Sequence, residues 1–309
     1  MTPENLISKN IKLVSLPEVC LRLQEISESP TATAEQVGQV IATDSALTAR
    51  LLQLVNSAYY GINAQIDTLP RAISLVGMRE LKNLAYAAST AKMFTGISDE
   101  HININGFWQH SVYCGIVGKH LAKYCSILHS ERLFTAGLLH DIGSLLIAML
   151  LPDETRQITA DYQKSERDLH LIEEDILDFN HAELGATLLN SWNLPRNLCA
   201  AILYHHLPAE AHDAHLESAI LHIANKVSEY AQGFKQAPES RLFDPFESLL
   251  NSDIHAETIA ATAIKQMDKS ALTLTAISEQ QLIGAIRFAA TGFDQVMEII
   301  YPTAMSEMT

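Results

Sequence analysis

The sequence contains little glycine and proline, with 13 and 10 residues in a chain of 309. Alternating runs of Val, Ile and Thr, which are typical of β-strands, are nearly absent, whereas Ala and Leu are abundant. This composition predicts an all-α fold. The chain is long enough to bury a large core and to form one to three domains.

Basic residues are also scarce, since 21 Lys and Arg stand against 36 Asp and Glu and give a formal net charge of -15. Such a charge repels nucleic-acid backbones and anionic membranes. The sequence has no run of Lys or Arg that would form a basic patch. We therefore expect neither a nucleic-acid partner nor a membrane partner.

The first residues, Met1 to Leu6, lack the charged-then-apolar pattern of a signal peptide. No Cys-x-x-Cys pair occurs, and the cysteines are scattered as Cys20, Cys114, Cys125 and Cys199. They are typical of small buried hydrophobic residues in a reducing compartment. These features predict a cytoplasmic protein.

The most apolar stretch covers residues 136–151, and His140 lies beside Asp141 near its start. Apolar residues fall on every face of a 3.6-residue period, which predicts a helix buried all round. The stretch is too short for a membrane span. An ionised carboxylate buried there requires compensation by a protonated His140, a remote Arg or Lys, or a metal ion. Alternatively, both side chains are hydrogen-bonded to neighbouring helices.

Capping signals predict further helices along the chain. Thr33 and Asn180 each precede a Gln or Glu by three residues, as in a capping box, and Asp44 is a typical N-cap. The helix after Asp44 is expected to continue to Gly61, a stop signal. We predict an N-terminal helical subdomain over 1–95, a histidine-bearing helical core over 96–232, and a C-terminal helical segment over 233–309. The boundaries rest on the polar segments 95–99 and 233–245.

Histidines are concentrated in the predicted core. Those on or beside apolar helices are His110, His140, His181, His205 and His206, while His222 and Asn225 lie one turn apart on one helix face. Imidazoles and a carboxylate without cysteine favour Fe, Mn, Zn or Ni over Mg. The remaining histidines in this region are expected at the solvated surface: His120, His129, His170, His212 and His215.

In this order on successive helices, His110, His140-Asp141, His181 and His205-His206 resemble the HD superfamily of metal-dependent phosphohydrolases. Residues 10–232 more closely resemble the HDOD family of bacterial signalling proteins, an HD branch with an additional N-terminal helical region. The matching motifs are Leu16-Pro17, 41–47 (IATDSAL), 54–60 (LVNSAYY), 72–77 (AISLVG), 137–143 (GLLHDIG), 181–185 (HAELG) and 192–195 (WNLP).

The resemblance implies a metal-ligand set of His110, His140, Asp141, His181, His205 and His206. Its closing ligand, an aspartate in the catalytic relatives, is Asn225 here, and an amide cannot bridge two cations as a carboxylate does. Ser144 replaces the lysine usual in cyclic-dinucleotide phosphodiesterases, and no Gly-Tyr-Pro follows His206. These departures argue against cyclic-di-GMP hydrolysis.

Two functions follow from the resemblance. The first is a signalling or regulatory protein without strong catalysis, metal-loaded, that contacts a signalling protein or a small phosphorylated ligand. The second is a metal-dependent phosphohydrolase acting on a nucleotide or phosphoester. The first is preferred because of Asn225 and the scarcity of phosphate-binding cations, for which Lys119, Lys123 and Arg132 are the nearest candidates.

Overall fold

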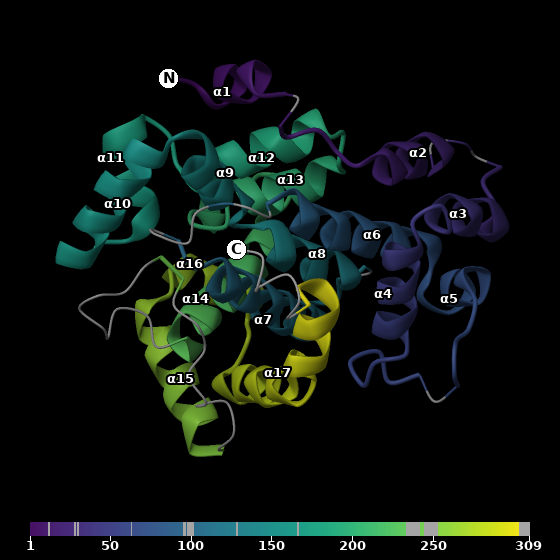
Figure 1. Cartoon of the computed structure of the whole chain (residues 1–309). Helices are drawn as coiled ribbons and strands as arrows, with labels where there is room; N and C mark the ends of the chain where they lie inside the picture. Colours follow the sequence, from purple (N-terminus) through teal and green to yellow (C-terminus); the bar gives the residue numbers. More distant parts are fainter. Residues whose placement is uncertain are drawn as a thin grey trace. The chain divides into compact units, whose positions relative to one another are not determined.

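The computed structural model describes residues 1–11, 13–27, 29, 31–62, 64–94, 97, 102–127, 129–165, 167–232, 242–243 and 253–302. Every regular element in these ranges is a helix, as Figure 1 shows, and β pairing within them is limited to an isolated parallel bridge between Ile102 and Leu242. The predicted all-α fold is confirmed.

Contacts divide the chain into two compact units, and each is described by itself. One unit comprises Met1–Val14 and Gly96–Ala290 with Thr309, and the other comprises Ser15–Thr95 and Thr291–Met308. All of the expected boundary at 95–99 except Ile97, and all of the loop at 233–245 except Leu242 and Phe243, lie outside the described residues. The three-part division of the chain stays a prediction.

The unit built around residues 15–95 consists of short helices. They are α2 (Glu18–Ser27), α3 (Ala34–Ile41), α4 (Ser45–Val55), α5 (Leu69–Val76), α6 (Met78–Met93) and the last part of α17 (Glu279–Ile300). Thr33 forms the predicted capping box, and Asp44 caps α4. The prediction that this helix reaches Gly61 was wrong: it ends at Val55, because Asn56 turns the chain by bonding the backbone of Ile66 with both side-chain atoms.

The other unit carries the candidate site. Its helices are α1 (Pro3–Lys9), α7 (Ile104–Ala122), η1 (Lys123–Cys125), α8 (Glu131–Leu139), α9 (Ile142–Leu150), α10 (Pro152–Lys164), α11 (Leu169–Leu177), α12 (His181–Ser191), α13 (Arg196–Leu203), η2 (Pro208–Glu210), α14 (His215–Ala231), α15 (Asp253–Gln266), α16 (Lys269–Thr275) and the first part of α17. In it α7 packs against α8 and α14, and α12 packs against α9 and α13.

The predicted single helix over 136–151 was wrong, because the chain breaks between α8 and α9. Asp141 leaves the helical region with φ -98° and ψ 11°, and the His140 ring bonds back to the Gly137 carbonyl. The break turns the His-Asp pair toward the neighbouring helices. Taken together, Glu131–Leu150 is long and apolar enough to cross a membrane, but 83% of its most apolar window is buried inside the fold. This degree of burial is typical of a segment in the core of the fold.

Two glycine contacts bring the site-bearing helices close together. A Cβ atom on Gly137 would lie 2.4 Å from the backbone of Gly115, so α8 and α7 touch there without side chains between them. A Cβ atom on Gly143 would lie 1.9 Å from the carbonyl oxygen of His181. Because α9 and α12 meet backbone to backbone, Asp141 and His181 are held within reach of each other.

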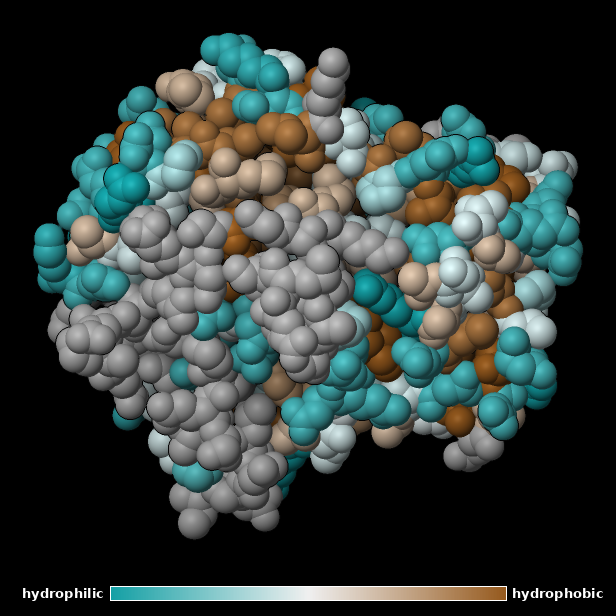
Figure 2. Space-filling view, viewed as in Figure 1, coloured by the Kyte–Doolittle hydropathy of each residue, from teal (hydrophilic) through white to brown (hydrophobic). Residues whose placement is uncertain are grey.

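In the coloured part of Figure 2, polar and charged residues alternate with exposed apolar ones. Exposed ion pairs there and elsewhere, such as Arg22–Glu18 on α2 and Arg156–Asp153 on α10, contribute at most about 1 kcal/mol each. The fold is therefore stabilised mainly by its apolar core, which includes the fully buried Trp108 and Phe134.

Candidate metal centre

All the residues of the predicted ligand set come from one unit and meet in its interior. His110 lies on α7, the His140-Asp141 pair lies at the joint of α8 and α9, and His181 opens α12 behind the predicted Asn180 cap. His205 and His206 follow the end of α13, and Asn225 lies on α14. His206 is half-buried and the others are buried.

The first group of ligand atoms is formed by His110, His140 and Asp141. The two Nε2 atoms of His110 and His140 lie 3.3 Å apart, and Asp141 Oδ2 lies 3.5 Å and 3.1 Å from them. Asn225 Oδ1 lies 2.9 Å from His110 Nε2. The ligand atoms of the three titratable residues lie within 4.8 Å of one another, which is close enough to share a metal ion.

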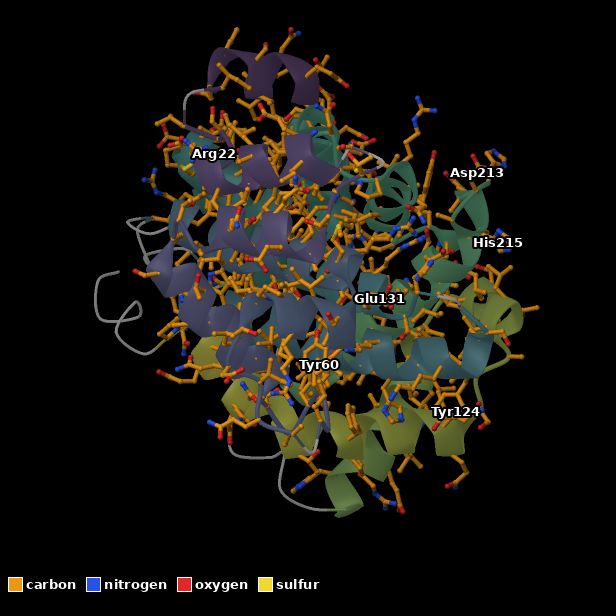
Figure 3. The ribbon with its side chains drawn as sticks, turned by 90° about the vertical axis from the view of Figure 1, so that its right-hand side faces the viewer. Arg22, Tyr60, Tyr124, Glu131, Asp213 and His215 are labelled. Atoms are coloured by element: carbon orange, nitrogen blue, oxygen red, sulfur yellow. The ribbon has the colours of Figure 1, made fainter. Side chains whose placement is uncertain are left out.

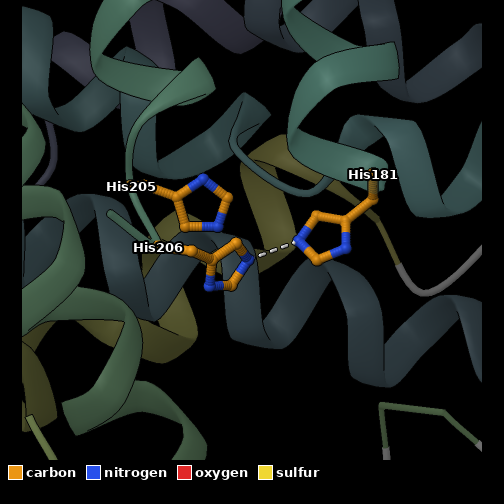
Figure 4. A group of neighbouring side chains, drawn as sticks. All are labelled: His181, His205 and His206. Atoms are coloured by element: carbon orange, nitrogen blue, oxygen red, sulfur yellow. Dashed lines mark hydrogen bonds between the residues drawn. The ribbon is translucent and has the colours of Figure 1, made fainter. Parts of the chain in front are cut away.

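The second group is formed by His181, His205 and His206, shown in Figure 4. The Nε2 atoms of His181 and His206 lie 2.8 Å apart. Asp141 connects this group to the first, because its other oxygen, Oδ1, lies 3.2 Å from His181 Nε2 and 3.6 Å from His205 Nε2. One carboxylate thus faces both histidine groups.

Hydrogen bonds at Nδ1 fix the ring orientation of His110, His140 and His205. His140 Nδ1 donates to the Gly137 carbonyl at 2.9 Å, and His205 Nδ1 donates to the Ile202 carbonyl at 2.7 Å. His110 Nδ1 donates to Gln232 Oε1 at 2.9 Å, and the Gln232 amide is itself oriented by donating to the Gly106 carbonyl. With the proton on Nδ1, each Nε2 directs a lone pair into the centre.

The centre therefore collects acceptor atoms that face one another. Asp141 Oδ1 and His205 Nε2 are both buried and have no hydrogen-bond partner among the described residues. Buried acceptors without a donor are unfavourable unless a cation lies between them. Imidazole nitrogens and a carboxylate are ligands that transition metals accept, so the residues present fit a divalent metal ion.

The pKa values of the site residues in the metal-free cluster are consistent with a set of metal ligands. Burial lowers the pKa of His110 to about 4, and burial also holds the pKa of His205 and His206 well below the usual range. For Asp141, burial opposes ionisation, but His140 and His181 outweigh it and hold its pKa well below the usual value. The centre thus contains an ionised carboxylate with the neutral imidazoles of His110, His205 and His206 around it.

Glu173 on α11 positions His181 and was not predicted from the sequence. Its Oε2 accepts hydrogen bonds from the His181 backbone N–H at 2.8 Å and from Nδ1 at 2.6 Å. Burial lowers the pKa of His181, but Glu173 and Asp141 outweigh that effect and raise it to about 10. In the metal-free cluster the charge of Asp141 is therefore balanced by the His181 imidazolium, which was not among the compensators considered from the sequence, namely a protonated His140, a remote Arg or Lys, or a metal ion.

Among the histidines expected at the surface, His170 was predicted wrongly. It is 8% exposed, and its ring stacks on that of His206 at 4.0 Å, because α11 folds its apolar face onto the centre. His212 and His215 are exposed as predicted, and Figure 3 shows His215 at the start of α14. His120 and His129 are half-buried. His222 is buried, donates from Nδ1 to the His205 carbonyl and accepts from the Asp268 N–H.

A cleft of about 610 Å³ reaches the centre from outside. Residues of the predicted ligand set form part of its wall, namely His110, Asp141, His181, His206 and Asn225. It is also lined by Tyr162, Asp168, Lys226 and Tyr230. Its volume is in the range typical of small-molecule sites.

The cations expected near a phosphate were predicted wrongly, since Lys119, Lys123 and Arg132 are not among the described residues that line the cleft. Lys119 follows His110 by nine residues on α7, which places it roughly 13 Å farther along the helix axis. Two lysines line the cleft, the exposed Lys164 at the end of α10 and the buried Lys226, which follows Asn225 on α14. The sequence offered a signal for it, because Lys226 stands within an apolar helix.

Comparison with known proteins identifies the family. The HDOD domain model matches residues 13–208, which is more than half of the chain. The chain belongs to the HDOD family. The resemblance described from the sequence motifs is thereby confirmed, and the His/Asp centre lies at the positions that the motifs indicated.

Among curated proteins, this HDOD chain is 28% identical over 233 residues to an uncharacterized protein of Treponema pallidum (strain Nichols). The match covers 74% of this chain and 45% of that protein, so the chain spans less than half of its relative's length.

Solved structures share the fold. A candidate phosphohydrolase of Shewanella amazonensis SB2B is 24% identical with a TM-score of 0.64, covering 92% of this chain and 97% of its own. An HDOD domain protein of unknown function from Geobacter sulfurreducens is 21% identical with a TM-score of 0.63, covering 93% and 99%. A candidate signal transduction protein of Marinobacter aquaeolei VT8 is 18% identical with a TM-score of 0.65, covering 95% and 59%. At these identities the likeness establishes the fold alone.

Proposed function

We propose that this protein is an HDOD signalling protein whose His/Asp centre holds a divalent transition metal of the Fe, Mn, Zn or Ni type. The observation that carries the proposal is the convergence of the Nε2 atoms of His110, His140 and His205 on the Asp141 carboxylate, where Asp141 Oδ1 and His205 Nε2 lack a hydrogen-bond partner among the described residues. The ligands would be His110, His140, Asp141, His181, His205 and His206, with Asn225 beside them. When bound, such an ion supplies a Lewis-acidic positive charge that attracts phosphoryl oxygens.

Signalling is preferred over strong catalysis because of the charge of the ligand set. Asp141 is the carboxylate that faces both histidine groups, and Asn225 brings no charge to the first. Glu173 is occupied by His181. A single shared carboxylate balances one divalent ion better than two, so we expect a binding centre that responds to one metal ion rather than a two-metal hydrolase.

Asn225→Asp tests this account of the charge. The substitution places a carboxylate where Asn225 Oδ1 now lies, 2.9 Å from His110 Nε2. Because metal affinity increases with ligand charge, we expect the metal dissociation constant to fall by at least about tenfold. The constant is measured by competition with a chromogenic chelator, and metal content by plasma mass spectrometry. Unchanged affinity and metal content would show that Asn225 lies outside the metal site.

The second candidate function is a metal-dependent phosphohydrolase, and the cleft that opens onto His110, Asp141 and His181 is the observation that favours it. The test is turnover of phosphoesters and nucleotides by the metal-loaded protein. Turnover that stops in His140→Ala and in chelated protein would favour the enzyme. Stoichiometric metal without turnover would favour the signalling module.

Glu173→Gln is expected to weaken metal binding by about tenfold to a hundredfold, because the carboxylate orients His181 and raises the basicity of its ring. Glu174→Gln is a suitable comparison, since this neighbour bonds the Asn180 side chain rather than a ligand. Metal affinity of the two variants is compared by chelator competition, and helical circular dichroism checks the fold. Equal affinity in both variants would contradict a positioning role for Glu173.

A further inference from the structure

A lysine is buried in the wall of the cleft, and the proposed metal centre does not use it. Lys226 follows Asn225 on α14, is 7% exposed and lines the cleft together with His181 and His206. Lysine is almost never this buried unless its ammonium is paired. A cation retained at this depth beside a metal centre points to a role in recognising a negatively charged group.

The partners of Lys226 differ in how firmly they hold it. Glu229, one turn farther along α14, accepts from Nζ at 2.9 Å and its side chain is 20% exposed. Asp168, at the N-terminus of α11, accepts at 3.5 Å and its side chain is 55% exposed. The ammonium carries three N–H donors, and these carboxylates take two of them. The third donor has no partner among the described residues, and the long contact to Asp168 can be exchanged for a ligand oxygen.

The positive charge of Lys226 affects His206 of the second histidine group and its neighbour His170. Burial is the main reason why the pKa values of His206 and His170 are low, and repulsion by the Lys226 ammonium lowers both further. The pKa of Lys226 itself is lowered by burial but raised more strongly by Glu229 and Asp168, so the side chain is charged. A metal ion held by the proposed ligand set and this ammonium would therefore both face the cleft.

We propose that Lys226 is the anion anchor of the cleft and that the ligand is a phosphorylated small molecule. The proposal rests on the metal site proposed above. A phosphate group has enough oxygens to contact a metal ion and an ammonium at once, and its double charge balances both. The cleft volume of about 610 Å³ leaves room for an organic part beyond the phosphate, and Tyr162 and Tyr230 offer aromatic surface for it.

Inorganic phosphate is the probe, titrated calorimetrically into the full-length, metal-loaded protein. Lys226→Gln is expected to weaken phosphate binding by at least about tenfold, because a charge-assisted hydrogen bond is lost. Asp168→Asn is expected to strengthen it about threefold, because the exposed carboxylate no longer competes for the ammonium. Lys123→Gln is the matched control, since Lys123 is exposed on η1 and lies over the Phe288 ring, and should leave the affinity unchanged.

The gain in Asp168→Asn should disappear in the Lys226→Gln background if the freed ammonium causes it, whereas a gain that persists there would come only from reduced repulsion of phosphate by the cleft wall. Phosphate affinity that is equal in wild type, Lys226→Gln and Asp168→Asn would overturn the anchor, as would a wild-type protein that holds metal but does not bind phosphate. Metal content of the same samples separates the two proposals. A wild type that retains no metal refutes the metal centre, whereas metal retained with phosphate binding independent of Lys226 refutes only the anchor.

Discussion

Asp141→Asn is expected to lower metal affinity by more than about a hundredfold, the largest effect on binding of any single substitution in the centre. Asp141 Oδ2 lies 3.1 Å from His140 Nε2, and Oδ1 lies 3.2 Å from His181 Nε2, so both histidine groups lose their shared charge at once. The side chain keeps its shape, and the helical signal should be retained. Metal affinity is measured by chelator competition and metal content by plasma mass spectrometry.

Asp153→Asn is the control for this substitution. Its carboxylate on α10 is 87% exposed and pairs with Arg156 at the surface. The same change of charge there should leave metal affinity and stability within error, because exposed ion pairs contribute little. Asp141→Asn protein that is folded and retains its metal would contradict the assignment of Asp141 as the shared ligand.

Gly143→Ala is expected to cause the largest loss of stability, about 3 kcal/mol or more. A Cβ atom there would lie 1.9 Å from the His181 carbonyl oxygen, and backbone on both sides prevents the clash from being relieved by a side-chain rotation. Because the proposed centre needs α9 and α12 in contact, metal affinity should fall in the same variant. Urea denaturation of the chelated protein measures the stability, so that loss of metal does not contribute to the difference.

Gly284→Ala provides the comparison for Gly143→Ala. Gly284 lies within α17, and a Cβ atom there meets nothing within 4 Å among the described residues. Alanine is a better helix former than glycine, so this variant should be more stable by about 0.5–1 kcal/mol. The two Gly→Ala substitutions are expected to change stability in opposite directions. Comparing them separates the effect of the close backbone contact from that of helix propensity. Gly143→Ala protein as stable as the wild type would contradict the contact.

Local signals in the sequence were sufficient for the helices and their caps. The Asn180 capping box predicted where α12 begins, and hence that His181 lies in its first turn. The motif order also placed the predicted ligands on successive helices, and the structure brings them together. Capping and periodicity depend on neighbours within a few residues, which is why they can be recognised without a fold.

Features that depend on packing between distant helices could not be predicted in this way. The break at Asp141 results from contacts of α9 with α12, and Glu173 reaches His181 only after α11 folds back onto the centre. His170 was predicted at the surface because it follows the polar residues 164–168 near a helix end, yet its ring stacks on His206. Lys226 was overlooked although it stands within an apolar helix, because its place in the cleft wall depends on residues far away in the sequence, such as Asp168.

The central claim is that the converging histidines and Asp141 hold a metal ion, and metal content tests it most directly. The full chain is purified without a metal-affinity column and analysed by plasma mass spectrometry beside His140→Ala and His206→Ala. We predict a stoichiometric transition metal in the wild type and its loss in both variants, with the helical signal retained. A wild type without stoichiometric metal, with both variants equally folded, would contradict the claim and leave the histidines as part of a metal-free binding scaffold.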